Sequence, residues 1–149
     1  MRSKAIVTGV GATEFGTLST EDAYTLGARA LNLALDDAGM TKNDIDALIV
    51  MRIPEYQRFS QLFGVDPDMV IPMPGQGRMS GIAMRVACSL IASGTAKNVA
   101  ITYGNDGKSA GAKYGGVADR YAGNEGAVWF PYGMTSPGAV HAMLFSMHA

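Results

Sequence analysis

The most regular pattern in the chain is a run of apolar residues at helical spacing between Met79 and Gly94. One side of this helix carries Met79, Ile82, Ala83, Val86, Ala87, Leu90 and Ile91, and the other carries Gly81, Met84, Cys88 and Ala92. Both sides are apolar or small. Because a helix of this kind is buried all round, the pattern predicts a central helix covered on two faces.

Short apolar runs bounded by turn residues predict four buried strands, at residues 5–8, 47–51, 69–73 and 98–104. A helical pattern separates the first two runs and another separates the last two. Successive strands joined by a helix pair in parallel, since such crossovers are nearly always right-handed. The sequence therefore predicts two βαβ units in an α/β protein with a parallel sheet.

The helix of the first unit has recognisable ends. Ser19 or Thr20 is the predicted N-cap, and Gly39 is the predicted left-handed stop. Its buried stripe is predicted to hold Leu26, Ala30, Leu33 and Ala34. Residues 41–44 predict a capped turn, and residues 56–63 predict a short helix between the second and third strands.

The character of the chain changes after Gly104. Residues 105–126 are rich in glycine and predict a long loop, which precedes an aromatic cluster (Trp129, Phe130 and Tyr132) and a helical pattern over residues 137–149. We therefore divide the chain into an incomplete α/β core, residues 1–104, and the start of a loop excursion, residues 105–149. A second copy or another chain could cover the far side of the central helix, but we favour a piece of a longer protein.

Composition narrows the class of protein. The chain has 149 residues, 48% apolar and 17% charged, with a net charge of −1, which argues against disorder and against nucleic-acid binding. Its one cysteine excludes an intrachain disulfide and favours the cytoplasm. No apolar run reaches the ~20 residues of a membrane span. The two histidines and the cysteine lack metal-ligand spacing, so we expect no metal site.

Candidate chemistry gathers in the glycine-rich turn that opens the central helix, residues 75–81. Backbone N–H groups and the positive end of the helix dipole meet at such a turn. By contrast, Gly9 and Gly11 are not followed by the third glycine of a dinucleotide fingerprint, because Glu14 stands there. We interpret that earlier segment as an ordinary turn.

Four stretches, spread in order along the chain, resemble the N-terminal part of the thiolase superfamily and most closely the sterol-carrier-protein type. They are residues 5–16, 28–50, 80–99 and 130–139. The resemblance implies a layered αβαβα fold in which two sheets enclose a central helix layer. This chain would supply an incomplete N-terminal half, with a parallel sheet and the buried central helix.

The family places a catalytic cysteine at the start of that helix, and this chain has none there. Alignment on Ser80 and Gly81 puts the cysteine position at Arg78, whereas alignment through the helix puts it at Gly77. Both registrations remove the nucleophile. Cys88 lies about ten residues further on, roughly 15 Å along a helix, and we expect it to be an inert core residue.

Several residues are candidates for contact with coenzyme A or its acyl group: Arg78, Met79, Ser80 and Lys108. Arg78 either turns to solvent, since a cation opposes the dipole of a helix start, or meets an anion of the substrate. Lys108, Lys113 and Arg120 in the glycine-rich loop could contact coenzyme A phosphates, although solvated loop charge is the default interpretation. Because the family's acid–base residues fall beyond Ala149, we expect His141 and His148 to be structural or surface residues. The aromatic cluster could line an acyl channel, but we favour packing of the loop domain or a dimer interface.

The resemblance implies a lipid-metabolic enzyme that makes or breaks a C–C bond next to a coenzyme A thioester by aldol-type chemistry, without a cysteine acyl-enzyme. Coenzyme A enters as part of the substrate, and no other cofactor is implied. The family implies a homodimer formed through the first half, and several relatives work with a small acyl-CoA-binding partner. The alternative is a non-catalytic subunit that binds acyl-CoA or supports assembly. A conventional thiolase would need a reactive Cys88.

Overall fold

The computed structural model describes residues 5–18, 20–73 and 79–111. The chain divides into two compact units, Met1–Asp106 and Gly107–Ala149. The first unit contains the regular elements, which are α1 (Ala23–Ala38), the 3-10 turn η1 (Lys42–Asp44), β1 (Ala47–Met51), α2 (Tyr56–Phe63), β2 (Met69–Met73), α3 (Met79–Ala92) and β3 (Val99–Tyr103). In the second unit, residues 107–111 form a turn.

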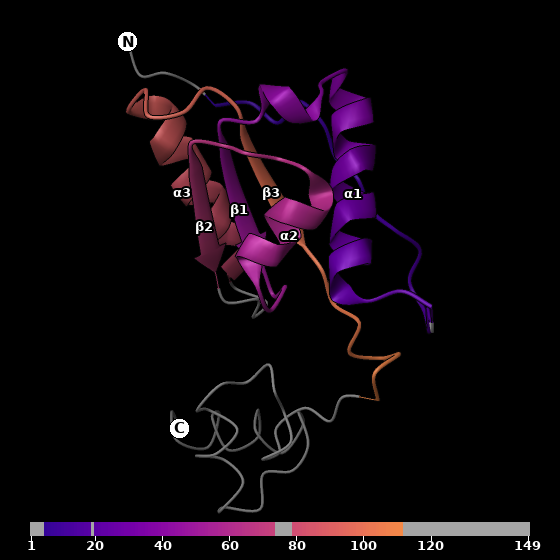
Figure 1. Ribbon diagram of the computed structural model, residues 1–149. Helices are drawn as coiled ribbons and strands as arrows, with labels where there is room; N and C mark the ends of the chain where they lie inside the picture. The colour runs from indigo at the N-terminus through magenta and orange to yellow at the C-terminus, as the bar shows by residue number, and fades with distance from the viewer. Residues whose placement is uncertain (1–4, 19, 74–78, 112–149) are drawn as a thin grey trace, which may run out of the picture. The chain divides into compact units, whose positions relative to one another are not determined.

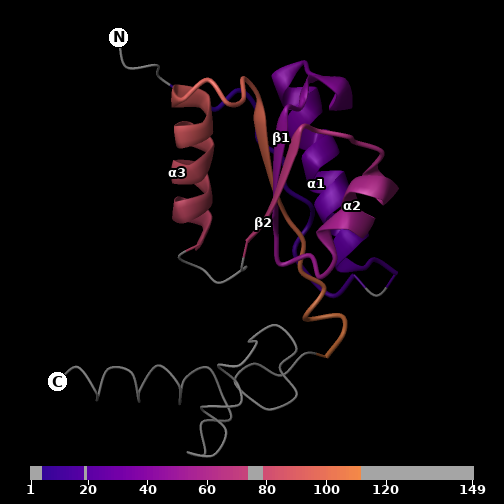
Figure 2. The ribbon, with the colours of Figure 1, turned by 60° about the vertical axis from the view of Figure 1, so that its left-hand side comes forward.

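A three-stranded parallel sheet lies at the centre of the first unit, with strand order β2-β1-β3. Ala47 pairs with Met69 on one side and with Val99 on the other, and the pairing runs in register to Met51. Helices α1 and α2 cover one face of the sheet and α3 covers the other (Figures 1 and 2). The predicted α/β class and parallel pairing are confirmed.

Strand β1 carries the core because both of its faces are covered. All five of its residues are buried, and its side chains alternate between the two layers. Leu48 and Val50 belong to a cluster with residues of α1 and α2, whereas Ile49 and Met51 pack with Ala83 and Ala87 of α3; the first cluster also holds Leu31, Leu35, Ile45, Ile53, Phe59 and Phe63. This two-sided burial explains why β1 is uniformly apolar.

Helix α1 has the predicted left-handed stop but a different start. Gly39 has φ 64°, and the N–H groups of Gly39 and Met40 close the helix end. The N-cap is Asp22, not Ser19 or Thr20, and its carboxylate accepts a hydrogen bond from Thr25 N at 2.8 Å. This carboxylate satisfies the free N–H of Thr25 in the first turn, so the helix begins at Ala23.

The predicted buried stripe of α1 is only partly correct. Leu26 is buried, but Leu33 is 45% exposed, and the side chains that meet the sheet layer include Leu31 and Leu35. Ala30 and Ala34 are half-buried for another reason. The backbone of Gly9 and Gly11 lies so close to these alanines that a Cβ on either glycine would collide with the helix backbone.

The predicted strand at residues 5–8 is wrong. This segment is not in the sheet, and the side chains of Ile6 and Val7 are 77% and 64% exposed. Both edges of β1 are taken by β2 and β3, and the following segment is held on α1 instead. There Val10 N donates to Asp37 Oδ2 at 2.9 Å.

Candidate active site

The three strands end at the same edge of the sheet. Met51 is paired with Met73 of β2 and with Tyr103 of β3, and Gly104 N donates to Met51 O at 3.3 Å. The starts of α1 and α3 reach this edge too, since each helix runs antiparallel to the strands (Figure 1). The carboxyl edge therefore brings two helix starts and three strand ends together.

The two connections that follow β1 and β2 lead to helices on opposite faces of the sheet. From β1 the chain passes to α2 on one face, and from β2 it passes to α3 on the other (Figure 2). Right-handed crossovers give this result, because β2 and β3 lie on opposite sides of β1. In open α/β sheets, ligands bind in the crevice that forms between two such strand ends. By this rule, the position expected for a ligand in this topology is beside the carboxyl ends of β1 and β2.

Arg52 and Ile53 directly follow the carboxyl end of β1. Ile53 is 6% exposed and belongs to the core cluster of α1 and α2. Arg52 is half-buried and has φ 60°, a left-handed conformation that costs a non-glycine residue about 1–2 kcal/mol. Sequence reasoning gave Arg52 no role. A polar residue after a uniformly apolar strand was the only signal available, because φ is not readable from the sequence.

The start of α1 packs against the carboxyl end of β3. Gly104 lies against the Ala23 backbone so tightly that a Cβ there would meet the Ala23 carbonyl oxygen. Two residues earlier, the buried Thr102 donates its hydroxyl to Gly27 O at 3.0 Å. These contacts fix β3 against α1, so the geometry of the edge is set by packing and not by the loops alone.

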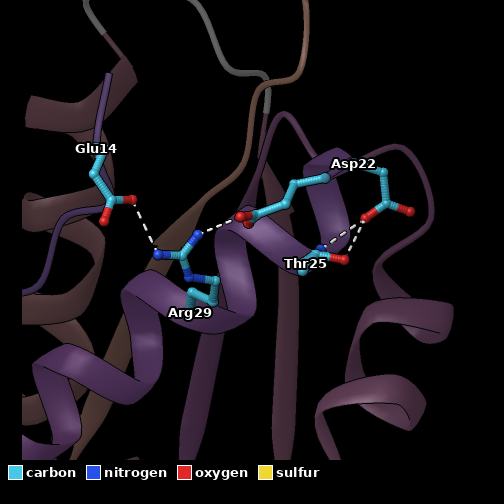
Figure 3. A network of polar contacts seen from close by, with 5 residues as sticks. Glu14, Asp22, Thr25 and Arg29 are labelled. Carbon is cyan, nitrogen blue, oxygen red and sulfur yellow. Dashed lines mark hydrogen bonds and ion pairs between the residues drawn. The ribbon is translucent and has the colours of Figure 1, made fainter. Parts of the chain in front are cut away.

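A charged network holds the N-terminal segment beside the α1 start. Arg29 contacts Glu14 at 3.0 Å and also contacts Glu21 (Figure 3). The Glu14 carboxylate is stabilised by its own backbone N–H and then by the Arg29 guanidinium, which together lower its pKa. The two glutamates raise the pKa of Arg29 in turn. All three side chains lie on α1 or its approach, so the network is structural.

The residues predicted for substrate contact are found in three different situations. Gly77 and Arg78 lie outside the described residues. Met79 is half-buried and packs against the Ile49 and Met51 cluster, and Ser80 is exposed in the first turn of α3. Lys108 is exposed and belongs to the second unit. The structure therefore places Met79 and Ser80 beside the carboxyl edge. His141, His148 and the aromatic cluster lie outside the described residues.

Helix α3 is covered on one side only within the described part of the chain. Ala83 and Ala87 are buried against the sheet, whereas Ile82 and Met84 are 43% and 44% exposed. A shallow groove runs along the outer side, lined by Ile82, Arg85, Val86, Ser89, Leu90 and Ser93. The prediction that the chain supplies only one sheet against this helix agrees with these exposures.

Cys88 is exposed, so the prediction that it is a core residue is wrong for this chain. It lies on α3 nine residues after Met79, roughly 13 Å along the helix axis. This distance separates the thiol from the helix start. Among residues 5–18, 20–73 and 79–111, no group of three or more His, Cys, Asp or Glu could hold a metal ion, and no helix is long and apolar enough to cross a membrane.

No protein-family model matches the chain, and no curated protein does. A solved structure does match: a chain of the "Ltp2-ChsH2(DUF35) aldolase" is similar with a TM-score of 0.69 at 24% sequence identity. The similarity covers 91% of this chain and 35% of that one. The protein thus has the fold of about one third of a chain in that aldolase structure.

Proposed function

We propose that this chain is the helix-bearing N-terminal part of a thiolase-like protein that makes or breaks a C–C bond next to a coenzyme A thioester. The observation that carries the proposal is the fold similarity to an aldolase, which covers 91% of the chain. The thiolase-like sequence stretches support the same assignment. So does the carboxyl edge of the sheet, where the connections after β1 and β2 lead to opposite faces. Enzymatic activity belongs to the full-length protein.

The chemistry in this proposal needs no cysteine nucleophile. Residues 74–81, which join β2 to the first turn of α3, contain no cysteine. Cys88 is too far along α3 to reach a substrate at the helix start. An acyl group consequently stays on coenzyme A throughout the reaction, and the protein does not form a thioester of its own.

The contribution of this part of the protein is to stabilise charge. When the C–C bond of a β-hydroxyacyl thioester breaks, its electron pair moves onto the thioester as an enolate, and the hydroxyl proton passes to a base. Backbone N–H groups of residues 75–79 and the dipole of α3 are the proposed donors to that enolate. Arg78, Met79, Ser80 and Lys108 are the proposed substrate contacts, and the base is expected beyond residue 149.

Mass spectrometry of the intact full-length protein tests the absence of an acyl-enzyme. We expect cleavage of a β-hydroxyacyl-CoA with no covalent adduct, and a Cys88→Ser variant should keep its rate within about twofold, because the thiol takes no part. A stable acyl adduct on wild-type protein, or loss of turnover in that variant, would contradict the proposal.

Assembly is the second part of the proposal. The name of the matched structure joins two proteins, and the chain spans about a third of the matched chain. We propose a homodimer through this half and a small acyl-CoA-binding partner. The alternative, a non-catalytic binding or assembly subunit, is favoured if the full-length protein with its partner binds acyl-CoA but turns none over.

A further inference from the structure

The N-terminal segment, residues 5–15, holds four of the nine large apolar side chains that are exposed within the described part of the chain. Ile6, Val7, Val10 and Phe15 are between 64% and 97% exposed. Leu33 of α1 adds a fifth exposed side chain beside them, because a Cβ at position 11 would lie 2.8 Å from Leu33 Cβ. Apolar side chains gathered in this way mark a surface for interaction with another protein.

The segment is fixed on α1 in an extended conformation (Figure 1). A Cβ at Gly9 would lie 2.2 Å from Ala34 O, and a Cβ at Gly11 would lie 2.2 Å from Ala30 O. Two residues of the segment thus advance past four residues of α1, which is about 6 Å along a helix. An extended chain, which rises about 3.3 Å per residue, covers that length in two residues.

Alternation along an extended chain then decides which side chains point outward. Because positions 9 and 11 face α1, positions 6, 8 and 10 face away from it. These positions hold Ile6, Thr8 and Val10, and all three residues are exposed. All three are also β-branched, which is the class of side chain that fits a paired strand.

The backbone of the segment is open to pairing. Within the described part of the chain, the peptide groups of residues 5–9 make no hydrogen bond to another backbone group. Val10 N donates to Asp37 Oδ2 at 2.9 Å, so the N–H groups on that side of the segment turn toward α1. Successive N–H groups of an extended chain point to opposite sides, which directs those of Val7 and Gly9 the other way. A row of unpaired peptide groups is a template for strand addition.

We propose that residues 5–10 pair antiparallel with the same residues of a second copy of this chain, about a twofold axis at Thr8. The segment is complementary to itself in this register, because Ile6 of one copy lies opposite Val10 of the other and the two threonines meet at the axis. Residues 5–13 carry no charged side chain, so no like charges oppose each other. This pairing gives a surface to the homodimer and rests on that part of the proposed function.

The exposed area agrees with a homodimer. The five apolar side chains expose about 400 Å² per copy, taking about 60–120 Å² for a whole aliphatic side chain and about 150–250 Å² for a phenylalanine. A standard interface buries about 800 Å² per partner, of which about 65% is apolar in homodimers. The surface therefore supplies most of the apolar area that a stable homodimer needs, and the paired backbones supply hydrogen bonds.

Two matched double variants of the full-length protein test the pairing by sedimentation equilibrium. Ile6→Lys/Val10→Glu, the opposite-charge variant, places a cation opposite an anion twice across the axis, whereas Ile6→Lys/Val10→Lys, the like-charge variant, places two cations opposite each other. We expect the dimer of the like-charge variant to dissociate with a Kd at least about tenfold higher than that of the opposite-charge variant. Leu62→Lys, at an exposed position of α2, is the control and should keep the wild-type Kd.

Equal Kd values for the two double variants would show that the dimer forms through another surface, and would overturn the inference without affecting the proposed chemistry. A monomeric wild type would contradict both the inference and the homodimer. Cleavage of a β-hydroxyacyl-CoA, assayed on the same samples, tests the chemistry separately. Circular dichroism checks the fold of the variants. If either is unfolded, hydrogen exchange of the wild type decides, because the amides of Val7 and Gly9 should exchange more slowly as dimer forms, and exchange independent of protein concentration overturns the inference.

Discussion

Two glycines inside helices have opposite surroundings. A Cβ at Gly27 of α1 would lie 2.6 Å from Ile53 Cδ1 and 3.3 Å from Thr102 Oγ1, whereas a Cβ at Gly81 of α3 would meet nothing within 4 Å. Helix propensity alone predicts that alanine stabilises both positions by about 1 kcal/mol. The space around each glycine decides whether alanine stabilises the helix at that position.

We expect Gly27→Ala to destabilise the protein by about 1–3 kcal/mol, because Ile53 and the Thr102 hydroxyl must move. Gly81→Ala should stabilise it by about 0.5–1 kcal/mol. Urea unfolding followed by helix circular dichroism measures both changes in the 149-residue chain, where the surroundings of Gly81 are open. Equal shifts of the same sign would show that close packing at Gly27 does not govern its identity.

At the residue scale, the sequence identified the helix stop at Gly39 and the capped turn at residues 41–44, because each depends on local chemistry. It placed Met79 and Ser80 at the start of α3, beside the carboxyl edge. The left-handed conformation of Arg52 was missed because it depends on tertiary structure.

At the scale of elements, Asp46 links the amino ends of two neighbouring strands. Its carboxylate accepts hydrogen bonds from Lys97 N at 2.7 Å and Asn98 N at 2.8 Å, just before β3. These bonds, the one from Asn98 first, lower the pKa of Asp46. The carboxylate thereby fixes the turn that feeds β3 into its place beside β1.

This linkage predicts a pH dependence of stability. Because the folded pKa of Asp46 is below its unfolded value of about 3.9, its contribution is complete above that value and is lost as pH falls through the folded pKa. Asp46→Asn should lower the thermal midpoint at pH 7 and reduce the further fall on acidification to pH 3.

Asp66→Asn, on an exposed residue between α2 and β2, is the matched control for that measurement. Its thermal midpoint should follow the wild type at both pH values. If Asp46→Asn also retains the full acid sensitivity of the wild type, the carboxylate does not support the β1–β3 turn.

The sequence predicted the elements β1, α2 and β2 with their observed bounds, since their apolar runs end at strong turn residues. It failed for residues 5–8. A β-branched run indicates that residues 5–8 could form a strand. Whether they join the sheet depends on which strands occupy the edges of β1. Gly9 and Gly11 allow close packing on α1, and that tertiary contact outweighs local propensity.

At the scale of the whole molecule, the outer side of α3 is notable because its apolar side chains are exposed. An apolar helix with exposed Ile82 and Met84 is unusual on a finished surface, and the chain corresponds to 35% of the matched chain. We propose that a second α/β half of the full-length protein covers this side. The αβαβα layering predicted from the thiolase resemblance requires that arrangement.

The reactivity of Cys88 can show whether a second half packs on α3, because Cys88 lies on this helix and is exposed in this chain. If a second half packs on α3, iodoacetamide should label Cys88 in the native full-length protein at least about tenfold more slowly than in urea. A cysteine introduced by Asn32→Cys, at an exposed position of α1, is the control and should react at nearly its denatured rate. Peptide mass spectrometry separates the two sites. Equal labelling of Cys88 in both states would mean that α3 stays open, and the layered fold would then have to be completed on another surface.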